Sequence, residues 1–135
     1  MEAKAIVNKM MEKDAFSQWL NIEILEINPG FCQLKTSVLP EMVNGFNIAH
    51  GGISYSLSDS ALAFAANAYG KQCVSIETSI SHTRPAKIGD ELMVTCTELN
   101  RGKTIGIYEV KIKNQADKII SLFKGTVHIS DRDWS

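Results

Sequence analysis

One acidic residue, Asp59, lies in the middle of an apolar segment that is rich in alanine, leucine and serine. A carboxylate is costly to bury unless it is paired or hydrogen-bonded, and aspartate also has a poor helix propensity. Two interpretations are open. Either the carboxylate bonds a serine neighbour (Ser56, Ser58 or Ser60) or reaches solvent at a seam, or its surroundings tune its pKa for catalysis. Asp59 is therefore the most informative candidate for a catalytic carboxylate.

Two glycines, Gly51 and Gly52, stand where this apolar segment begins. The first N–H groups of a helix have no intrahelical partner and carry a partial positive charge. Glycine leaves them open to a ligand, which is the arrangement of an oxyanion hole. A tight turn into a helix would use the same residues. No Lys-Ser or Lys-Thr follows, so the pair does not resemble a phosphate-binding P-loop.

Two polar residues precede the glycines. His50 could hold a loop or polarise a carbonyl group. Asn44 offers both a donor and an acceptor, so it could orient a water molecule or a substrate carbonyl, or stabilise a turn. Both residues are candidates for the same site.

The spacing of these residues has a consequence for assembly. Asp59 follows Gly52 by seven residues, which in a helix is roughly 10 Å along the axis. A reacting group must lie within about 3 Å of the carbon whose oxygen the N–H donors hold. If both features serve one active site, the carboxylate must come from a second subunit. We therefore expect a two-fold dimer with two composite sites.

Periodicity places these residues on one helix among strands. The helical segments are 2–20 and 53–69, and a loop covers 40–47. The strand-like segments are 21–28, 31–38, 72–82, 90–99, 104–113 and 118–129. The central helix carries Asp59 as its only ionisable acid and has no Lys or Arg, which is typical of a buried helix. The expected fold is α+β: one domain, residues 1–135, with an antiparallel sheet of about six strands around one helix.

Composition narrows the class of function. The chain has 135 residues and a formal net charge of −1, so we expect neither nucleic acid nor an anionic membrane as a partner. No apolar stretch is long enough to span a bilayer, and the N-terminus lacks a signal-peptide core. The three cysteines, Cys32, Cys73 and Cys96, have no metal-like spacing. They indicate reduced thiols in a cytoplasmic protein, and no metal site is expected.

The segment from Asn44 to Gly52, followed by Leu57 to Ala61, resembles the hotdog-fold acyl-CoA thioesterases of the PaaI type, which act in phenylacetate degradation. The family pattern is an Asn, a His-Gly-Gly six residues later, and an Asp eight residues after the first Gly. The chain matches that pattern without a gap. The resemblance runs from about residue 14 to 129, through the motifs Ser75-Ile-Glu, Arg84-Pro85, Gly89-Asp90, Gly106-Ile-Tyr108 and Leu122-Phe123-Lys124-Gly125.

The resemblance implies a hotdog fold, in which a curved sheet wraps a long central helix. It also implies a homodimer with joined sheets, paired again into a homotetramer. Asp59 becomes the general base or nucleophile, and the N–H of Gly51, assisted by Gly52, becomes the oxyanion donor. Asn44 and His50 then lie beside the thioester carbonyl and the attacking water. Ser75 matches a family Ser/Thr that helps to place that water.

The function that the resemblance implies is hydrolysis of phenylacetyl-CoA, its ring-hydroxylated forms or a similar aromatic or medium-chain acyl-CoA, without a cofactor, since CoA is part of the substrate. Cations should meet the CoA phosphates, and the candidates are Arg84 and Lys87, or Arg101 and Lys103. A hotdog hydratase or dehydratase is an alternative, although its typical glycine–histidine–phenylalanine–proline motif is missing. A non-catalytic acyl-CoA-binding module is another.

Overall fold

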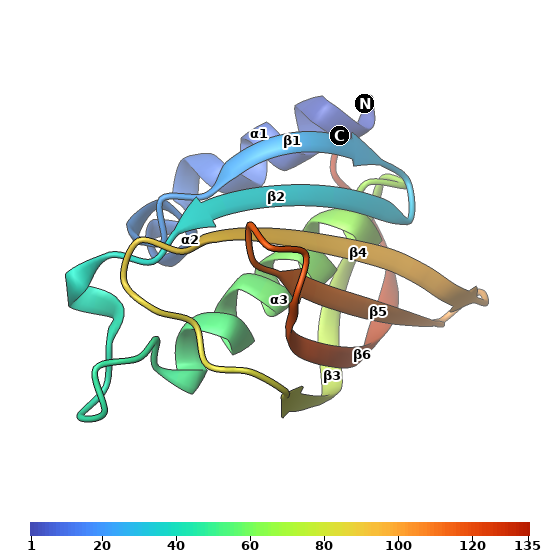
Figure 1. Ribbon diagram of the computed structural model, residues 1–135. Coiled ribbons are helices and arrows are strands. Elements are labelled where there is room, and N and C mark those ends of the chain that lie inside the picture. The colour runs from blue at the N-terminus through green and yellow to red at the C-terminus, as the bar shows by residue number, and fades with distance from the viewer.

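The computed structural model describes residues 1–135 as an α+β fold, in which a six-stranded sheet curves around one long helix (Figure 1). The predicted class is confirmed. The helices are α1 (Ala3–Lys13), α2 (Ala15–Trp19) and α3 (Gly51–Asn67), with one 3-10 turn, η1 (Pro40–Met42). The strands are β1 (Glu23–Asn28), β2 (Phe31–Ser37), β3 (Lys71–His82), β4 (Glu91–Arg101), β5 (Ile105–Lys113) and β6 (Ile119–Asp133).

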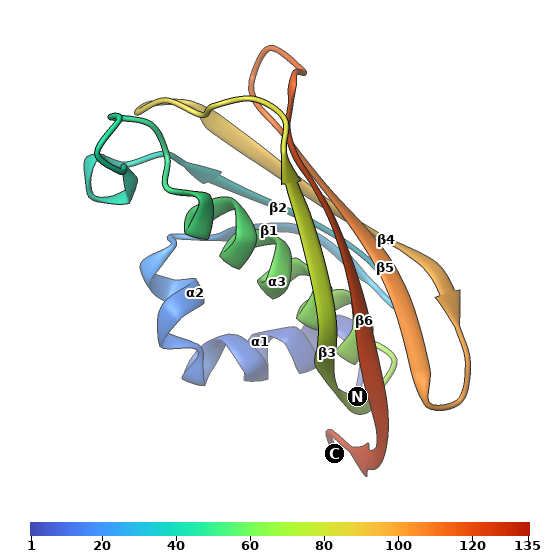
Figure 2. The same ribbon diagram turned by 90° about the horizontal axis from the view of Figure 1, so that it is seen from below.

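The sheet has the order β1-β2-β4-β5-β6-β3, and all neighbours are antiparallel. Side chains alternate between its two faces, because successive residues of a strand point to opposite sides. The apolar set on the concave face packs against α3 and forms the core; it includes Leu34, Val94, Tyr108, Val110, Ile112 and Phe123. Figure 2 shows α3 between this face and the pair α1–α2. The central helix is thus covered on two sides.

The α3 helix is buried along most of its length, as its lack of charge predicts. It begins two residues earlier than the sequence pattern indicates, because the glycines themselves form its first turn. It ends at Asn67, with Ala68 as its C-cap and Gly70 at a φ of +112°. Only glycine adopts such a φ without strain, so the chain turns there into β3.

The predicted single helix over 2–20 is in fact two helices, and the break lies at Asp14. The Asp14 backbone is non-helical, and its side chain accepts hydrogen bonds from the N–H and the hydroxyl of Ser17. An aspartate at an N-cap satisfies N–H groups that a new helix leaves unpaired, so it competes with continuation of the first helix. The Ser17 hydroxyl also meets Ser60 Oγ at 2.8 Å, which ties α2 to α3.

The β3 strand lies at one edge of the sheet and pairs only with β6. A bulge between Ser75 and Glu77 interrupts its register. Val74 and Ile76, two apolar residues of this strand, are 65% and 57% exposed. An open strand edge with exposed apolar side chains is a surface on which another strand can pair.

We expect Gly125→Ala to destabilise the fold by about 1–3 kcal/mol, the usual cost of overpacking a core. A methyl group at Gly125 would lie 2.6 Å from Leu62 Cδ2 and 3.0 Å from Phe123 Cε1. Chemical denaturation measures the change. The matched control is Gly45→Ala, where an added Cβ meets nothing within 4 Å. Equal stability of the two variants would contradict the packing described for β6 and α3.

Candidate active site at the start of the central helix

The start of α3 presents one backbone donor that no other group uses. The His50 side chain is the N-cap, and its Nδ1 accepts the N–H of Gly52 at 2.8 Å. The Ile53 N–H bonds to His50 O at 2.8 Å. The Gly51 N–H makes no hydrogen bond within the chain. Gly51 therefore has the open N–H donor. The Gly52 N–H, which was expected to assist it, already donates to His50.

Asn44 fills one of the two roles that the sequence left open, because it stabilises a turn. Its Oδ1 accepts the N–H of Phe46 at 2.9 Å and that of Ile48 at 3.4 Å, so it holds the loop before α3. Its amide NH₂ group has no hydrogen-bond partner in the chain and can still donate. Asn44 also lines the same cavity as Gly51.

That cavity has a volume of about 420 Å³. It lies between the loop before α3, the first turn of α3 and the segment after β3, and its lining includes Asn44, Gly51, Ser54, His82, Arg84 and Pro85. His82, to which the sequence assigned no chemistry, packs on Gly51: an added Cβ there would lie 3.2 Å from His82 Nε2. Its only sequence signal is its place at the end of a strand, just before the Arg84-Pro85 motif.

A second pocket, of about 310 Å³, opens on another side of the same helix start and contacts His50 and Gly52. Its other lining residues come from α2, from the 40–43 segment and from α3: Phe16, Trp19, Glu41, Met42, Val43, Ile53 and Ser56. The first turn of α3 thus separates two cavities.

Asp59 is half-buried on α3 and makes no hydrogen bond within the chain. The serines do not satisfy it: Ser58 Oγ donates to Ser54 O at 2.8 Å, and Ser60 Oγ meets Ser17. Burial raises the pKa of Asp59, and the negative charge of Asp14 raises that pKa further. The carboxylate lines neither cavity of its own protomer.

The remaining sequence candidates are spread out. Arg84 lines the cavity of Gly51, but Lys87 lies beyond it, where its backbone N–H bonds to Asp90 Oδ2 at 2.9 Å. Ser75 is exposed on the edge strand β3, away from both cavities. The structure brings together Asn44, His50, Gly51, Gly52 and Arg84 around the helix start, and does not bring Asp59, Ser75 or Lys87 to them within one chain.

Arg101, one of the cations considered for the CoA phosphates, points into the fold instead. Its Nη1 donates to Ala66 O at 3.1 Å and to Tyr108 Oη at 2.8 Å, and its guanidinium stacks 3.9 Å from the ring centre of Tyr69. The Ala66 carbonyl belongs to the last turn of α3, where a cation complements the helix dipole. The role of Arg101 is to hold the end of α3.

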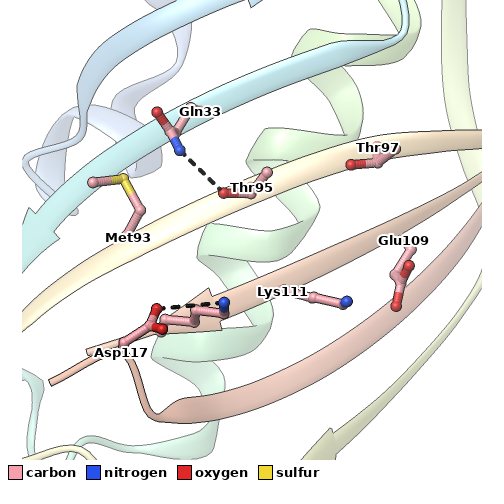
Figure 3. Close-up of a pocket in the computed structure, with 8 residues that line it drawn as sticks. Gln33, Met93, Thr95, Thr97, Glu109, Lys111 and Asp117 are labelled. Atoms are coloured by element: carbon pink, nitrogen blue, oxygen red, sulfur yellow. Dashed lines mark hydrogen bonds and ion pairs between the residues drawn. The ribbon is translucent and has the colours of Figure 1, made fainter. Parts of the chain in front are cut away.

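A further cavity, of about 480 Å³, lies not at the helix start but on the outer face of the sheet. Figure 3 shows its side chains on β2, β4 and β5, with α3 behind the strands; Gln33 donates to Thr95 Oγ1 at 3.4 Å, and Lys113 pairs with Asp117. This groove is polar and shares no residue with the candidate site. The described chain has no group of three or more His, Cys, Asp or Glu side chains that could hold a metal ion.

Comparison with known proteins agrees with this architecture. The profile of the thioesterase superfamily matches residues 46–121, which include the start of α3 and Asp59. The chain belongs to the thioesterase superfamily. It is 37% identical over 119 residues to the acyl-coenzyme A thioesterase PaaI of Escherichia coli, covering 88% of this chain and 85% of that protein. The predicted PaaI-type resemblance is confirmed.

Solved structures of superfamily members give the same result. The E. coli PaaI structure matches with a TM-score of 0.94 and 34% identity, over 97% of this chain and 95% of that one. A hypothetical thioesterase of Streptococcus pneumoniae, solved with coenzyme A, matches with a TM-score of 0.87 and 25% identity, over 93% of this chain and 98% of that one. The expected hotdog thioesterase fold is confirmed. None of the helices has the length and apolar character needed to cross a membrane.

We expect Asp14→Asn to lower the pKa of Asp59. Asp14 is the one charged side chain that acts on the Asp59 carboxyl, and its charge favours the protonated form. Asparagine caps a helix about as well as aspartate, so α2 should persist. Carbon NMR of the side-chain carboxyl, followed against pH, measures the shift. An unchanged titration of Asp59 in a folded Asp14→Asn protein would contradict the predicted coupling between the two carboxylates.

Proposed function

We propose that the protein hydrolyses aromatic or medium-chain acyl-CoA thioesters to a free acid and CoA, in composite sites of a homodimer. One observation carries this proposal: an unbonded backbone donor, the Gly51 N–H, and an unbonded carboxylate, Asp59, lie on one helix at a spacing that fits two subunits. The chain is a thioester hydrolase by its family, and its relatives include acyl-CoA thioesterases of bacteria and of human.

The open edge of β3 supports the dimer. Two copies that pair their β3 strands would join two sheets into one and cover Val74 and Ile76. Two-fold symmetry then gives two equal sites, each with the helix start of one subunit and Asp59 of the partner subunit. Ser75 lies on the same strand and would be carried to this interface. A further pairing of dimers into a homotetramer is part of the proposal.

The reaction begins when the thioester carbonyl oxygen accepts the Gly51 N–H, whose donor strength the helix dipole increases. Asp59 of the partner subunit takes a proton from a water molecule, and the water oxygen attacks the carbonyl carbon. The resulting oxyanion stays on the Gly51 N–H. Its collapse breaks the carbon–sulfur bond, and the proton passes to the thiolate, so the products are a carboxylic acid and CoA. In the alternative route, Asp59 attacks the carbonyl carbon directly and displaces the CoA thiolate. Water then cleaves the resulting anhydride, and the products are the same acid and CoA.

The other polar groups have supporting roles in this proposal. Because His50 accepts the Gly52 N–H at Nδ1, the neutral ring carries its proton on Nε2 and can donate there. The free NH₂ of Asn44 is a second donor toward the carbonyl or the water. The hydroxyl of Ser75 helps to place the water from the interface.

Arg84, and Lys87 beyond it, are the proposed contacts of the CoA phosphates. The reaction needs no cofactor, since the thioester is already activated by its sulfur leaving group. The three cysteines, Cys32, Cys73 and Cys96, are free thiols, which is consistent with a protein that acts in a reducing compartment such as the cytoplasm.

Asp59→Asn should lower kcat by about 10²–10⁴-fold, the usual contribution of general-base catalysis, because an amide neither takes the proton nor attacks. Thiol release from acyl-CoA, followed with a thiol reagent, measures the loss. An Asp59→Asn protein that keeps most of the wild-type rate would refute the assigned role.

The control for this variant is its stability. The folded-state pKa of Asp59 is raised, so its contribution to stability is fully present below its unfolded pKa and is lost as pH rises through its folded pKa. The stability contributed by Asp59 is therefore lower at pH 7 than at acid pH. We expect Asp59→Asn to melt no lower than the wild type at pH 7 and to run at the same mass in light scattering.

Mixing two inactive variants tests the composite site. Asp59→Asn removes the carboxylate, and Gly51→Val blocks the donor where His82 already lies close. A heterodimer of the two contains one intact site, so random mixing by co-expression should restore about a quarter of the wild-type activity. If each site lay within a single protomer, the mixture would remain as inactive as its parents.

A further inference from the structure

Two cavities flank the start of α3, and a thioester has two arms. The carbonyl carbon of an acyl-CoA carries the acyl group on one side and the sulfur of CoA on the other. When the carbonyl oxygen is bound by the Gly51 N–H, the two arms extend away from the helix start in different directions. The two cavities differ in chemistry, and this difference assigns the arms.

The cavity on the Gly51 side is suited to the CoA arm. Asn44, His82 and Arg84 give it polar and cationic groups, and the Arg84 guanidinium can meet a phosphate. The pocket on the Gly52 side has no cation and carries the carboxylate of Glu41 at its lining. A CoA phosphate would be repelled there.

The pocket on the Gly52 side is suited to an apolar acyl group. Met42 and Ile53 are buried and, with Val43, give it an aliphatic floor. Phe16 and Trp19 contribute two aromatic rings that remain 55% and 47% exposed. Their ring centres lie 6.0 Å apart with planes tilted by 31°. Exposed aromatic side chains beside a reactive site lose contact with water when a ligand covers them.

The rings are held in place relative to the helix start. Asp14 caps α2, and the Ser17–Ser60 hydrogen bond of 2.8 Å fixes α2 on α3. Figure 2 shows α2 close to the start of α3. Phe16 and Trp19 therefore form a preformed wall, which is the kind of surface that selects a ligand by shape.

We propose that the pocket lined by Phe16, Trp19, Met42, Val43 and Ile53 binds the acyl group and that its two aromatic rings select flat, apolar acyl groups, while the CoA arm leaves through the cavity of Asn44 and Arg84. This assignment rests on the proposed thioesterase function and adds the residues that decide its acyl specificity. Trp19 and Phe16 are specificity-determining residues and take no part in the chemistry.

The kinetic test compares phenylacetyl-CoA with acetyl-CoA. In Trp19→Ala, the ratio of their kcat/KM values should fall by about tenfold or more, because loss of one apolar contact in a specificity pocket already changes discrimination by about 10–200-fold. Activity on acetyl-CoA should fall far less than activity on phenylacetyl-CoA, because the short acetyl group makes less contact with the pocket. Leu25→Ala, which removes an exposed apolar side chain outside both cavities, is the matched control and should leave the ratio unchanged. Arg84→Gln should raise KM for both substrates equally.

A binding test reads the same pocket without turnover. The chain has two tryptophans, Trp19 and Trp134. In Asp59→Asn protein that also carries Trp134→Phe, phenylacetyl-CoA should change the emission of Trp19, whereas free CoA should not. In the matching Trp19→Phe protein, where Trp134 is the only tryptophan, phenylacetyl-CoA should cause no change in tryptophan emission.

Two results would overturn the assignment. One is an unchanged substrate ratio in Trp19→Ala together with equal Trp19 responses to phenylacetyl-CoA and free CoA. The other is an equal loss with both substrates accompanied by a change of mass in light scattering, which would make the rings a contact between copies. Failure of Asp59→Asn to lose activity would instead refute the proposed function, and the emission of Trp19 would still report where the acyl group binds.

Discussion

The rigidity of one helix constrains every other part of this molecule. Gly51 and Asp59 lie on α3, and eight residues of helix separate them by about 12 Å along the axis. The helix is buried against the sheet and covered by α1 and α2, so it cannot bend to bring the two groups together. A carboxylate that faces no partner in its own chain is tolerated because it keeps partial contact with solvent, and the cost of its partial burial is seen in its raised pKa.

Those features of the site that depend on spacing along one helix could be predicted from the sequence. The absence of charge around Asp59 predicted a buried helix, and alternation predicted the strands within a few residues of their bounds. The Asn44-to-Asp59 pattern predicted the family. These signals are local, so they survive without any knowledge of tertiary packing.

Features that depend on competition between local interactions could not be predicted. Asp14 reads as one more polar residue on a helix, yet its cap with Ser17 breaks that helix in two. Gly52 reads as a second donor, yet His50 takes its N–H. Arg101 reads as a surface cation, yet it turns inward to the last carbonyls of α3. In each case one hydrogen bond, local for Asp14 and His50 and long-range for Arg101, decides between two roles that the same residue type can fill. Phe16 and Trp19 lie on the short helix that begins after the break at Asp14, and both remain about half exposed.

The open edge of β3 has a consequence for how the protein is made. A newly synthesised chain exposes the unpaired backbone groups of that strand beside Val74 and Ile76. Such an edge recruits any extended chain that it meets. If a second copy covers it, folding and assembly are coupled by mass action, and the melting temperature rises with protein concentration. Dilution, and not only heat, then becomes a way to lose the native state.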